Sequence, residues 1–257
     1  MAILAFHNIE DRFSIGINNY KPNKLRLLCE YLKGVGYVFG SISDNLASPD
    51  KEASLSFTFD DGYKSFIETA YPVLKEYSIP ATVFIPSAMI GRKNSWEYSS
   101  FLTPREHLSA TNIRRLSEEG VEIGSHGHSH IALTTLSDRF LRLELEKSKR
   151  ILEDLTGQPI NYISYPFGRV NKKVETAALE VGYERGFSLA RIPSGGSGFS
   201  IRRSAVYAWD SPYSVLKKTG GGAGAAMERF KEHIINSYSG GTILLNKLRG
   251  RNLPARD

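Results

Sequence analysis

The stretch Ala53-Ser54-Leu55-Ser56-Phe57-Thr58-Phe59-Asp60-Asp61-Gly62 decides the class of fold. Polar and apolar residues alternate over residues 53–59, and several are aromatic or β-branched, which predicts a β-strand there. The strand runs directly into two adjacent aspartates, Asp60 and Asp61. Because neighbouring carboxylates repel each other, such a pair at the end of a buried strand calls for a cation or a shared proton. An N-cap for the helix that follows is the alternative explanation, since aspartate favours that position.

Predicted strands and helices alternate on both sides of this stretch. Short apolar or β-branched runs predict strands over residues 3–6, 37–39, 81–85, 121–124, 162–165, 182–187, 201–209 and 242–245. Apolar residues at helical spacing predict helices over residues 23–34, 65–77, 111–119, 137–156 and 172–181. This alternation indicates parallel βαβ units. We therefore predict an α/β fold, a (β/α) barrel of about seven strands, as one domain over residues 1–257.

Length and composition agree with such a domain and exclude several classes of protein. The chain has 257 residues, 41% of them hydrophobic, which suffices for a packed core at the size of an α/β barrel. It contains no apolar run of about 18 residues, so we expect no membrane span. The N-terminus has no basic leader of the kind that precedes a secretory signal, which favours a cytoplasmic protein. A single cysteine, Cys29, excludes an internal disulfide framework and a cysteine-rich zinc site.

The net charge of +6 does not point to a particular partner. Basic residues are scattered along the chain and meet only in doublets such as Lys172-Lys173, Arg202-Arg203 and Lys217-Lys218. Dispersed charge is typical of an ordinary solvated surface, and no nucleic-acid-binding motif accompanies it. We therefore expect no nucleic-acid partner. The sequence contains no feature that sets an oligomeric state.

Polar residues gather where the predicted strands end. Apolar runs end at, or shortly before, His7, Asp60-Asp61, residues 126–130 and Pro166-Phe167. In (β/α) barrels, the loops that follow the carboxyl ends of the strands build the active site. These four groups are therefore predicted to lie on one rim of the barrel.

Three of the six histidines occur in Gly124-Ser125-His126-Gly127-His128-Ser129-His130. His126 and His130 are four residues apart, which places two imidazoles on one face of a turn or helix and suits a shared metal. Two imidazoles and one carboxylate form a known open zinc arrangement that leaves room for water and substrate. His128 then points elsewhere, and we expect it to pack or to support the site. The alternative is a histidine-rich surface loop.

The same residues resemble the motifs of the polysaccharide deacetylase superfamily, which includes chitooligosaccharide, chitin and peptidoglycan deacetylases. Thr58-Phe59-Asp60-Asp61-Gly62 is similar to the first motif, and residues 123–130 resemble the second, a His-x-x-x-His metal pair. Tyr165-Pro166-Phe167-Gly168 resembles the third motif. The resemblance extends over roughly residues 3–250 and implies a distorted (β/α) barrel with fewer repeats than a complete one.

This resemblance implies a metal-dependent hydrolase that removes an N-acetyl group from an amino sugar in a polysaccharide, an oligosaccharide or a glycolipid precursor. Asp61, His126 and His130 would bind a divalent metal, usually zinc, and Asp60 would be the general base. The metal would lower the pKa of a water molecule and polarise the acetamide carbonyl. The backbone N–H of Phe167 would face the oxyanion that forms.

The sequence departs from the family pattern at the proton donor. The usual acid is a histidine in a Leu-x-His pattern, whereas Leu244-Leu245-Asn246 stands here, and asparagine has no titrating proton to donate. We predict that His7 is the catalytic acid, because strand ends on one rim converge on the site and some family members carry a histidine at the end of an opening strand. The alternative for His7 is a hydrogen-bonded position in the core.

Two further motif positions also differ. Ser164 occupies the place of the third-motif arginine that usually supports the base, and Arg169 and Arg203 are candidates for that role without positional support. The fourth motif, an Asp-Trp pattern, is at best reordered as Ala208-Trp209-Asp210.

The candidate substrate-binding residues are Tyr165, Pro166, Phe167 and Trp209. Phe167 and Trp209 lie nearest the predicted rim, where an aromatic ring can support a sugar ring. The sequence leaves two other functions open: a catalytically impaired barrel that binds glycans, and a hydrolase of another non-peptide amide such as a cyclic imide or a formamide. Retention of both aspartates and both metal-pair histidines favours the enzyme, since an impaired barrel has little reason to keep the set.

Overall fold

Nine parallel strands form the main sheet among the residues that the computed structural model describes, which are 1–12, 17–48, 53–93, 105–189, 192 and 198–220. Their order is β10-β9-β8-β7-β6-β5-β1-β11, and β4 also pairs with β5. A separate short pair is formed by β2 (Asn8–Ile9) and β3 (Asn19–Tyr20). The strands of the main sheet are β1 (Ala2–Phe6), β4 (Val38–Phe39), β5 (Ser54–Phe59), β6 (Ala81–Ile85), β7 (Glu122–Ser125), β8 (Tyr162–Ser164), β9 (Arg185–Ser188), β10 (Ser200–Arg202) and β11 (Ser204–Ala205).

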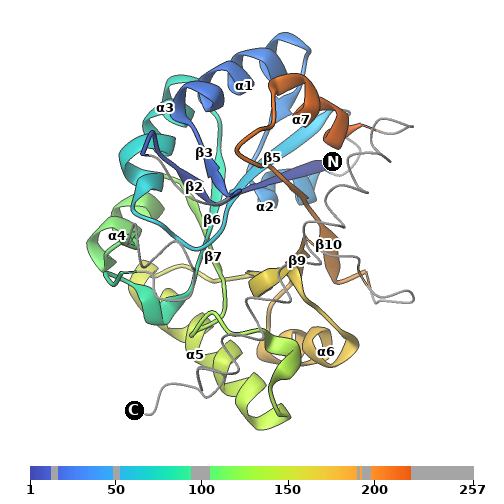
Figure 1. The fold of residues 1–257 in the computed structure, drawn as a ribbon. Helices are drawn as coiled ribbons and strands as arrows, with labels where there is room; N and C mark the ends of the chain where they lie inside the picture. The colour runs from blue at the N-terminus through green and yellow to red at the C-terminus, as the bar shows by residue number, and fades with distance from the viewer. Residues whose placement is uncertain (13–16, 49–52, 94–104, 190–191, 193–197, 221–257) are drawn as a thin grey trace.

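The sheet curls until it is nearly closed into a barrel, with the helices on its outside (Figure 1). Its two end strands, β10 and β11, follow each other in the chain and are separated by one residue, Arg203. No ladder joins β10 to β11 in the described part of the chain, so a seam runs between them. The distorted (β/α) barrel expected from the sequence is therefore confirmed.

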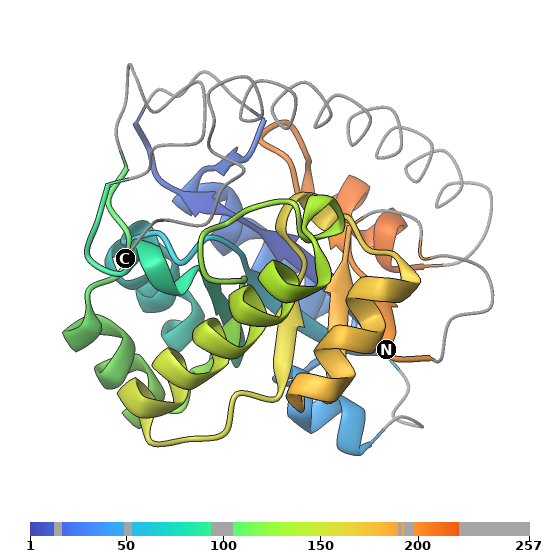
Figure 2. The ribbon, with the colours of Figure 1, turned by 90° about the horizontal axis from the view of Figure 1, so that it is seen from below.

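The helices cover the outer face of the barrel. Their bounds are α1 (Pro22–Gly34), α2 (Ile42–Ala47), α3 (Tyr71–Glu76), α4 (Ala110–Glu118), α5 (Asp138–Thr156), α6 (Lys172–Val181) and α7 (Pro212–Thr219). α5 and α6 run side by side, as the two views in Figures 1 and 2 show. A π-helical turn (Phe66–Ala70) precedes α3, because Pro72 has no N–H to donate to the carbonyl one α-helical turn earlier. The helix predicted over residues 65–77 therefore forms in two pieces.

Strand β5 is fixed on both of its faces. All six of its residues are buried. On one face, Phe6 of β1 contacts the rings of Phe57 and Phe59, with centroids 5.1 Å apart in each pair. Burial of each phenylalanine contributes roughly 1.5–3 kcal/mol to stability. On the other face, the hydroxyl of Thr58 donates to a backbone carbonyl of β1, so the carboxyl end of β5, with Asp60, is held in one register.

Some elements differ from the sequence prediction. α2 and α7 were not predicted, because each is short and begins in a stretch of serine, asparagine or proline that reads as a turn. The strand predicted over residues 201–209 forms as two short strands, β10 and β11, followed by a loop; Arg203, whose side chain is buried, separates the two strands along the chain. The strand predicted over residues 242–245 lies outside the described residues.

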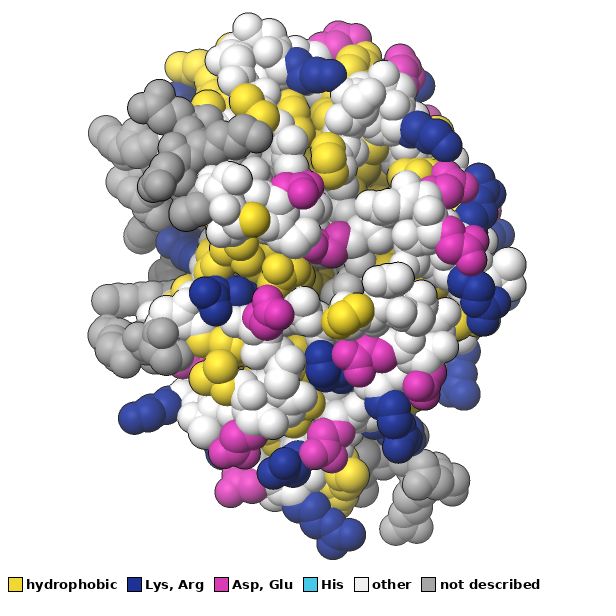
Figure 3. Space-filling view, turned by 180° about the vertical axis from the view of Figure 1, so that it is seen from behind, with side chains coloured by type: hydrophobic (Ala, Val, Ile, Leu, Met, Phe, Trp, Pro, Cys, Tyr) yellow, Lys and Arg dark blue, Asp and Glu magenta, His cyan; other side chains and the backbone are white. Residues whose placement is uncertain are grey.

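The surface carries charges of both signs. On the face that Figure 3 shows, the basic and acidic side chains outside the grey atoms are interspersed rather than gathered by sign. This arrangement agrees with the dispersed charge seen in the sequence. In the described part of the chain, no helix combines the length and the apolar character that crossing a membrane requires.

Candidate metal centre and catalytic site

The two adjacent aspartates point to different partners because the backbone turns between them. The N–H of Asp60 donates to the carbonyl of Phe6 in β1 at 2.9 Å, and Asp61 then adopts a left-handed conformation with φ +67°. Such a conformation costs a residue other than glycine about 1–2 kcal/mol. The N-cap of the π-helical turn is Ser65, so neither aspartate has the capping role that the sequence left open.

Asp61, His126 and His130 converge on one point. The Oδ1 atom of Asp61 lies 3.4 Å from Nε2 of His126 and 3.1 Å from Nε2 of His130. All three side chains are buried, and their donor atoms lie within 4.8 Å of one another. Ligands about 2.0–2.2 Å from a tetrahedral zinc ion are separated by roughly 3.3 Å, so the three residues fit a divalent metal.

His126 is held in the tautomer that metal binding needs. Its Nδ1–H donates to the carbonyl of Ser164 at 2.8 Å, which leaves the lone pair on Nε2, the atom that faces Asp61. Hydrogen bonds of this kind orient metal-binding histidines and increase their basicity. The Oδ1 atom of Asp61 is buried and has no hydrogen-bond partner among the described residues, as expected for an atom that is reserved for a metal.

The protonation states of the three side chains suit a cation. Burial alone would raise the pKa of Asp61, but the close approach of His126 and His130 holds that pKa well below its ordinary value. Burial lowers the pKa of His130, and Asp61 offsets only part of this effect. Burial would also lower the pKa of His126, but the charges of Asp60 and Asp61 raise it overall. The site therefore offers an anionic oxygen and two imidazoles, of which His126 takes up a proton more readily than His130.

Asp60 is not part of this cluster of donor atoms and binds Arg203. The guanidinium donates from Nη1 to Oδ1 of Asp60 at 2.8 Å and from Nη2 to Oδ2 at 2.7 Å. Burial would raise the pKa of Asp60, but the positive charge of Arg203 and then that of His126 lower it overall. Asp60 is therefore an ionised carboxylate, held in one orientation by a bidentate pair.

Arg203 reaches Asp60 because Ser164 leaves room for it. The guanidinium, 1% exposed, also donates to the hydroxyls of Thr58 at 2.9 Å and Ser164 at 2.6 Å. Of the two arginine candidates from the sequence, Arg203 is the one that supports Asp60. The sequence offers one signal for this role, an arginine inside a predicted strand of a barrel.

His7 follows β1 and lies close to both aspartates. After the larger effects of burial and of their direct partners, His7 is among the groups that lower the pKa of Asp60 and Asp61. Its side chain is half-buried, and its buried Nδ1 has no hydrogen-bond partner among the described residues. The hydrogen-bonded core position that the sequence left open is therefore not observed at Nδ1. Residues 244–246, which include Asn246, lie outside the described residues.

The candidate substrate residues occupy three different environments. Phe167 has φ +60° in the turn after β8, and its ring packs against that of His130 with centroids 4.9 Å apart. Trp209 is 56% exposed and stacks on Tyr207 with centroids 5.4 Å apart. Tyr165 is 1% exposed, and its hydroxyl pairs with that of Ser200 at 2.9 Å. Its ring therefore belongs to the core and offers no exposed face to a sugar.

Pro166 and His128 complete the set of predicted residues. Pro166 is buried in the turn that also holds Phe167. The Nδ1 atom of His128 lies 2.8 Å from the hydroxyl of Ser87. Among the described residues, the cluster of metal-donor atoms contains His126 and His130 and does not contain His128, in agreement with the supporting role expected for His128.

The chain is similar in sequence to proteins of a known family. The sequence profile of the family described as polysaccharide deacetylase matches residues 47–186, a range that includes both aspartates and both metal-pair histidines. The chain belongs to the polysaccharide deacetylase family. It is also 30% identical over 237 residues to YxkH of Bacillus subtilis strain 168, a protein named after this family, with 90% of this chain and 77% of that protein covered.

Other relatives of this polysaccharide deacetylase include enzymes with named substrates. A poly-beta-1,6-N-acetyl-D-glucosamine N-deacetylase of Staphylococcus aureus is 28% identical over 145 residues, which are 53% of this chain and 48% of that enzyme. The match thus spans about half the length of that relative. The family membership confirms the predicted enzyme class, a hydrolase that acts on carbon–nitrogen bonds of acetylated carbohydrates.

Solved structures share the fold of this polysaccharide deacetylase. The deacetylase PplD of Streptococcus pyogenes, in complex with acetate, matches with a TM-score of 0.73 and 21% identity over 86% of this chain and 98% of that chain. IcaB from Ammonifex degensii matches with a TM-score of 0.68 and 20% identity over 80% of this chain and 91% of that chain.

Proposed function

We propose that this polysaccharide deacetylase hydrolyses the N-acetyl group of an amino sugar in a polysaccharide, an oligosaccharide or a glycolipid precursor, with zinc held by Asp61, His126 and His130. One observation carries the proposal. A carboxylate oxygen of Asp61 lies beside the donor nitrogens of two imidazoles, whereas its neighbour Asp60 is paired with Arg203. A divalent metal at this site would polarise the acetamide carbonyl and lower the pKa of a water molecule from about 16 towards 7.

Asp60 has the role of general base in this proposal. Arg203 keeps its carboxylate ionised and fixes its orientation, so it accepts the proton of the water that attacks the acetamide carbon. The new carbon–oxygen bond forms as that proton moves to Asp60. The backbone N–H of Phe167 would donate to the oxyanion, from a turn in which Phe167 and Gly168 are both left-handed.

His7 has the role of general acid. It donates a proton to the sugar nitrogen as the carbon–nitrogen bond breaks, so that acetate and a free amine are released. Its place at the end of β1 and the unpartnered Nδ1 support this role. Trp209, with its exposed ring, and Phe167 are the proposed contacts for the sugar rings. The cytoplasmic location expected from the sequence remains a prediction.

The relatives guide the choice of substrate for the test. The purified chain, loaded with zinc, is incubated with poly-β-1,6-N-acetylglucosamine and with chitooligosaccharides, and free amine and acetate are both measured. We expect equal amounts of the two products from the parent, and at least about 10²-fold less of each from Asp60→Asn. Bound zinc without product from any acetylated amino sugar would favour the glycan-binding barrel. Turnover of a cyclic imide or a formamide alone would favour the other amide hydrolase.

A further inference from the structure

The loop 126–130 carries two of the three proposed metal ligands in a backbone conformation that needs outside support. His130 has φ +54° and Gly127 has φ +72°. For His130, the left-handed conformation costs about 1–2 kcal/mol. Contacts from outside the loop must therefore compensate for this cost if the loop is to keep its shape.

Glu144 of α5 makes three such contacts. Its Oε2 accepts hydrogen bonds from the backbone N–H groups of His128 at 3.0 Å and Ser129 at 2.9 Å. Its Oε1 accepts one from the hydroxyl of Ser129 at 2.6 Å. The residue is 2% exposed, and no lysine or arginine pairs with it in the described part of the chain. Its partners are thus two peptide N–H groups and one hydroxyl of the loop. Charge-assisted hydrogen bonds of this kind are stronger than hydrogen bonds between neutral groups.

Other contacts in the described part of the chain hold Gly127 and His128. Ser148, one helical turn after Glu144, donates its hydroxyl to the carbonyl of Gly127 at 2.9 Å. From the β6 side, the N–H of Ala88 donates to the carbonyl of His128 at 2.9 Å. Glu144 alone among these residues contacts Ser129, which directly precedes His130. It therefore constrains the peptide that sets the direction of the His130 side chain.

We propose that Glu144 is a positioning residue for the metal centre, which holds the loop 126–130 in its ligand-presenting shape before any metal binds. The inference rests on the proposed function, since it assumes a metal at Asp61, His126 and His130. A loop that is already ordered loses less conformational freedom when the metal binds. Residues that orient metal ligands typically account for about 10–100-fold in affinity when they are replaced.

Zinc affinity of the purified full chain, measured by competition with a chromophoric chelator, tests the proposal without any need for turnover. Glu144→Ala removes all three contacts and is expected to weaken zinc binding by about 10–100-fold. Glu144→Gln is expected to restore most of the affinity, because the amide oxygen still accepts from both N–H groups and the amide nitrogen can donate to the Ser129 hydroxyl. The visible spectrum of bound Co²⁺ should change in the alanine variant and return in the glutamine variant.

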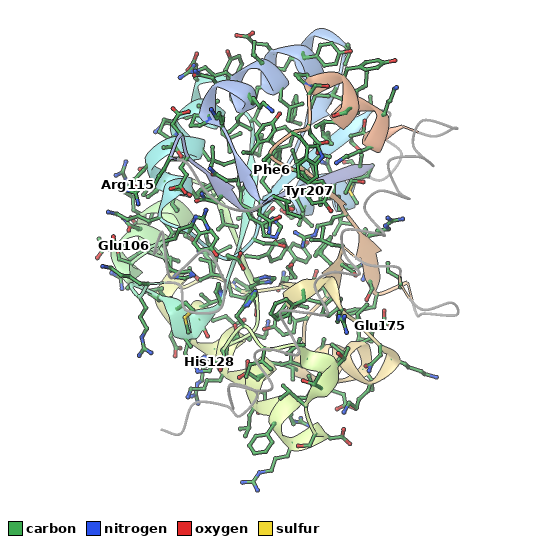
Figure 4. The ribbon with its side chains drawn as sticks, in the orientation of Figure 1. Phe6, Glu106, Arg115, His128, Glu175 and Tyr207 are labelled. Carbon is green, nitrogen blue, oxygen red and sulfur yellow. The ribbon has the colours of Figure 1, made fainter. Side chains whose placement is uncertain are left out.

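Glu175→Ala is the matched control. Glu175 is also a buried glutamate, 4% exposed, but it lies on α6 and apart from His128 in Figure 4. Its removal should leave zinc affinity within about twofold of the parent. Zinc affinity of Glu144→Ala within twofold of the parent, or an equal loss in the glutamine and alanine variants, would overturn the proposal.

Amide hydrogen exchange of the metal-free parent gives a result even where Glu144→Ala does not fold. The N–H groups of His128 and Ser129 are expected to exchange at least tenfold more slowly than in an unfolded chain. Exchange at the unfolded rate would overturn the role of Glu144. A parent chain that shows this protection but binds no zinc would instead contradict the proposed function.

Discussion

Arg203 binds Asp60 through two parallel hydrogen bonds, and it does so from the junction of β10 and β11. The family resemblance places a supporting arginine at the end of β8, where this chain has Ser164. In this chain the arginine that pairs with Asp60 comes instead from the junction of β10 and β11, and the hydroxyl of Ser164 accepts a hydrogen bond from its guanidinium. Asp60, the proposed base, thus has an arginine partner, although this arginine stands at a different position from the arginine of the family motif.

Removal of Arg203 should destabilise the fold. Arg203→Ala leaves the buried carboxylate of Asp60 without its cation, which typically costs about 3–5 kcal/mol in the free energy of unfolding. Denaturant unfolding at neutral pH measures this loss. In the double variant Arg203→Ala/Asp60→Asn the charge is absent, so we expect less destabilisation than the sum of the single variants. Additive effects would show that the two side chains do not interact.

Asp60→Asn should separate metal binding from chemistry. The amide cannot accept the proton of the attacking water, so the turnover number is expected to fall by about 10²–10⁴-fold. The metal content, measured by elemental analysis, should match that of the parent, because Asp61, His126 and His130 are unchanged. Turnover within tenfold of the parent would exclude Asp60 as the base.

Removal of His7 should slow the departure of the amine and leave metal binding unchanged. His7→Ala is expected to lower deacetylation of an amino sugar by about 10²–10⁴-fold with unchanged zinc affinity. An aryl acetate provides the internal control, because its phenolate departs without a proton and should still be hydrolysed. Equal losses with the two substrates would assign His7 to another role.

Zinc binding should weaken as the pH falls. Burial would lower the pKa of His126, but Asp60 and Asp61 raise it above its ordinary value of 6.5. The proton on His126 must therefore leave when the metal binds, whereas the pKa of Asp61, lowered by its histidine partners despite burial, keeps that ligand ionised. We expect the affinity to fall about tenfold per unit between about pH 6.5 and 5.5. Calorimetry in buffers with different ionisation enthalpies should detect the released proton, and an affinity that is constant over this range would contradict the prediction.

The barrel and the metal residues could be predicted because their signals are local in sequence. The strand over residues 53–59 ends at two aspartates within ten residues of chain, and His126 and His130 lie in one short loop. Periodicity then identifies the strands, and the topology of parallel strands brings their carboxyl ends to one rim. The family membership confirms this fold and also the enzyme class, which was expected from the resemblance of the motifs to that family.

The contacts that support the site could not be predicted, because they join distant parts of the chain. Arg203 and Asp60 are 143 residues apart. No regular spacing in the sequence pairs an arginine at the end of one strand with an aspartate at the end of another. Glu144 reads as one more polar residue on an amphipathic helix until α5 is packed against the loop. Tyr165 was expected near the substrate because of its motif, but the alternation of β8 and the turn that follows direct its ring to Ser200.

Arg203, which lies at the seam between β10 and β11, also links parts of the barrel that are far apart in the chain. At that seam no backbone ladder connects the edges of the barrel in the described residues, yet the guanidinium reaches Thr58, at the end of β5, and Ser164, at the end of β8. One side chain thus links three separate strands across the barrel and also maintains the charge of the proposed base. Stability and the proposed catalysis thus depend on the same residue: a change that removes these links across the barrel also removes the positive charge that, against the effect of burial, lowers the pKa of Asp60.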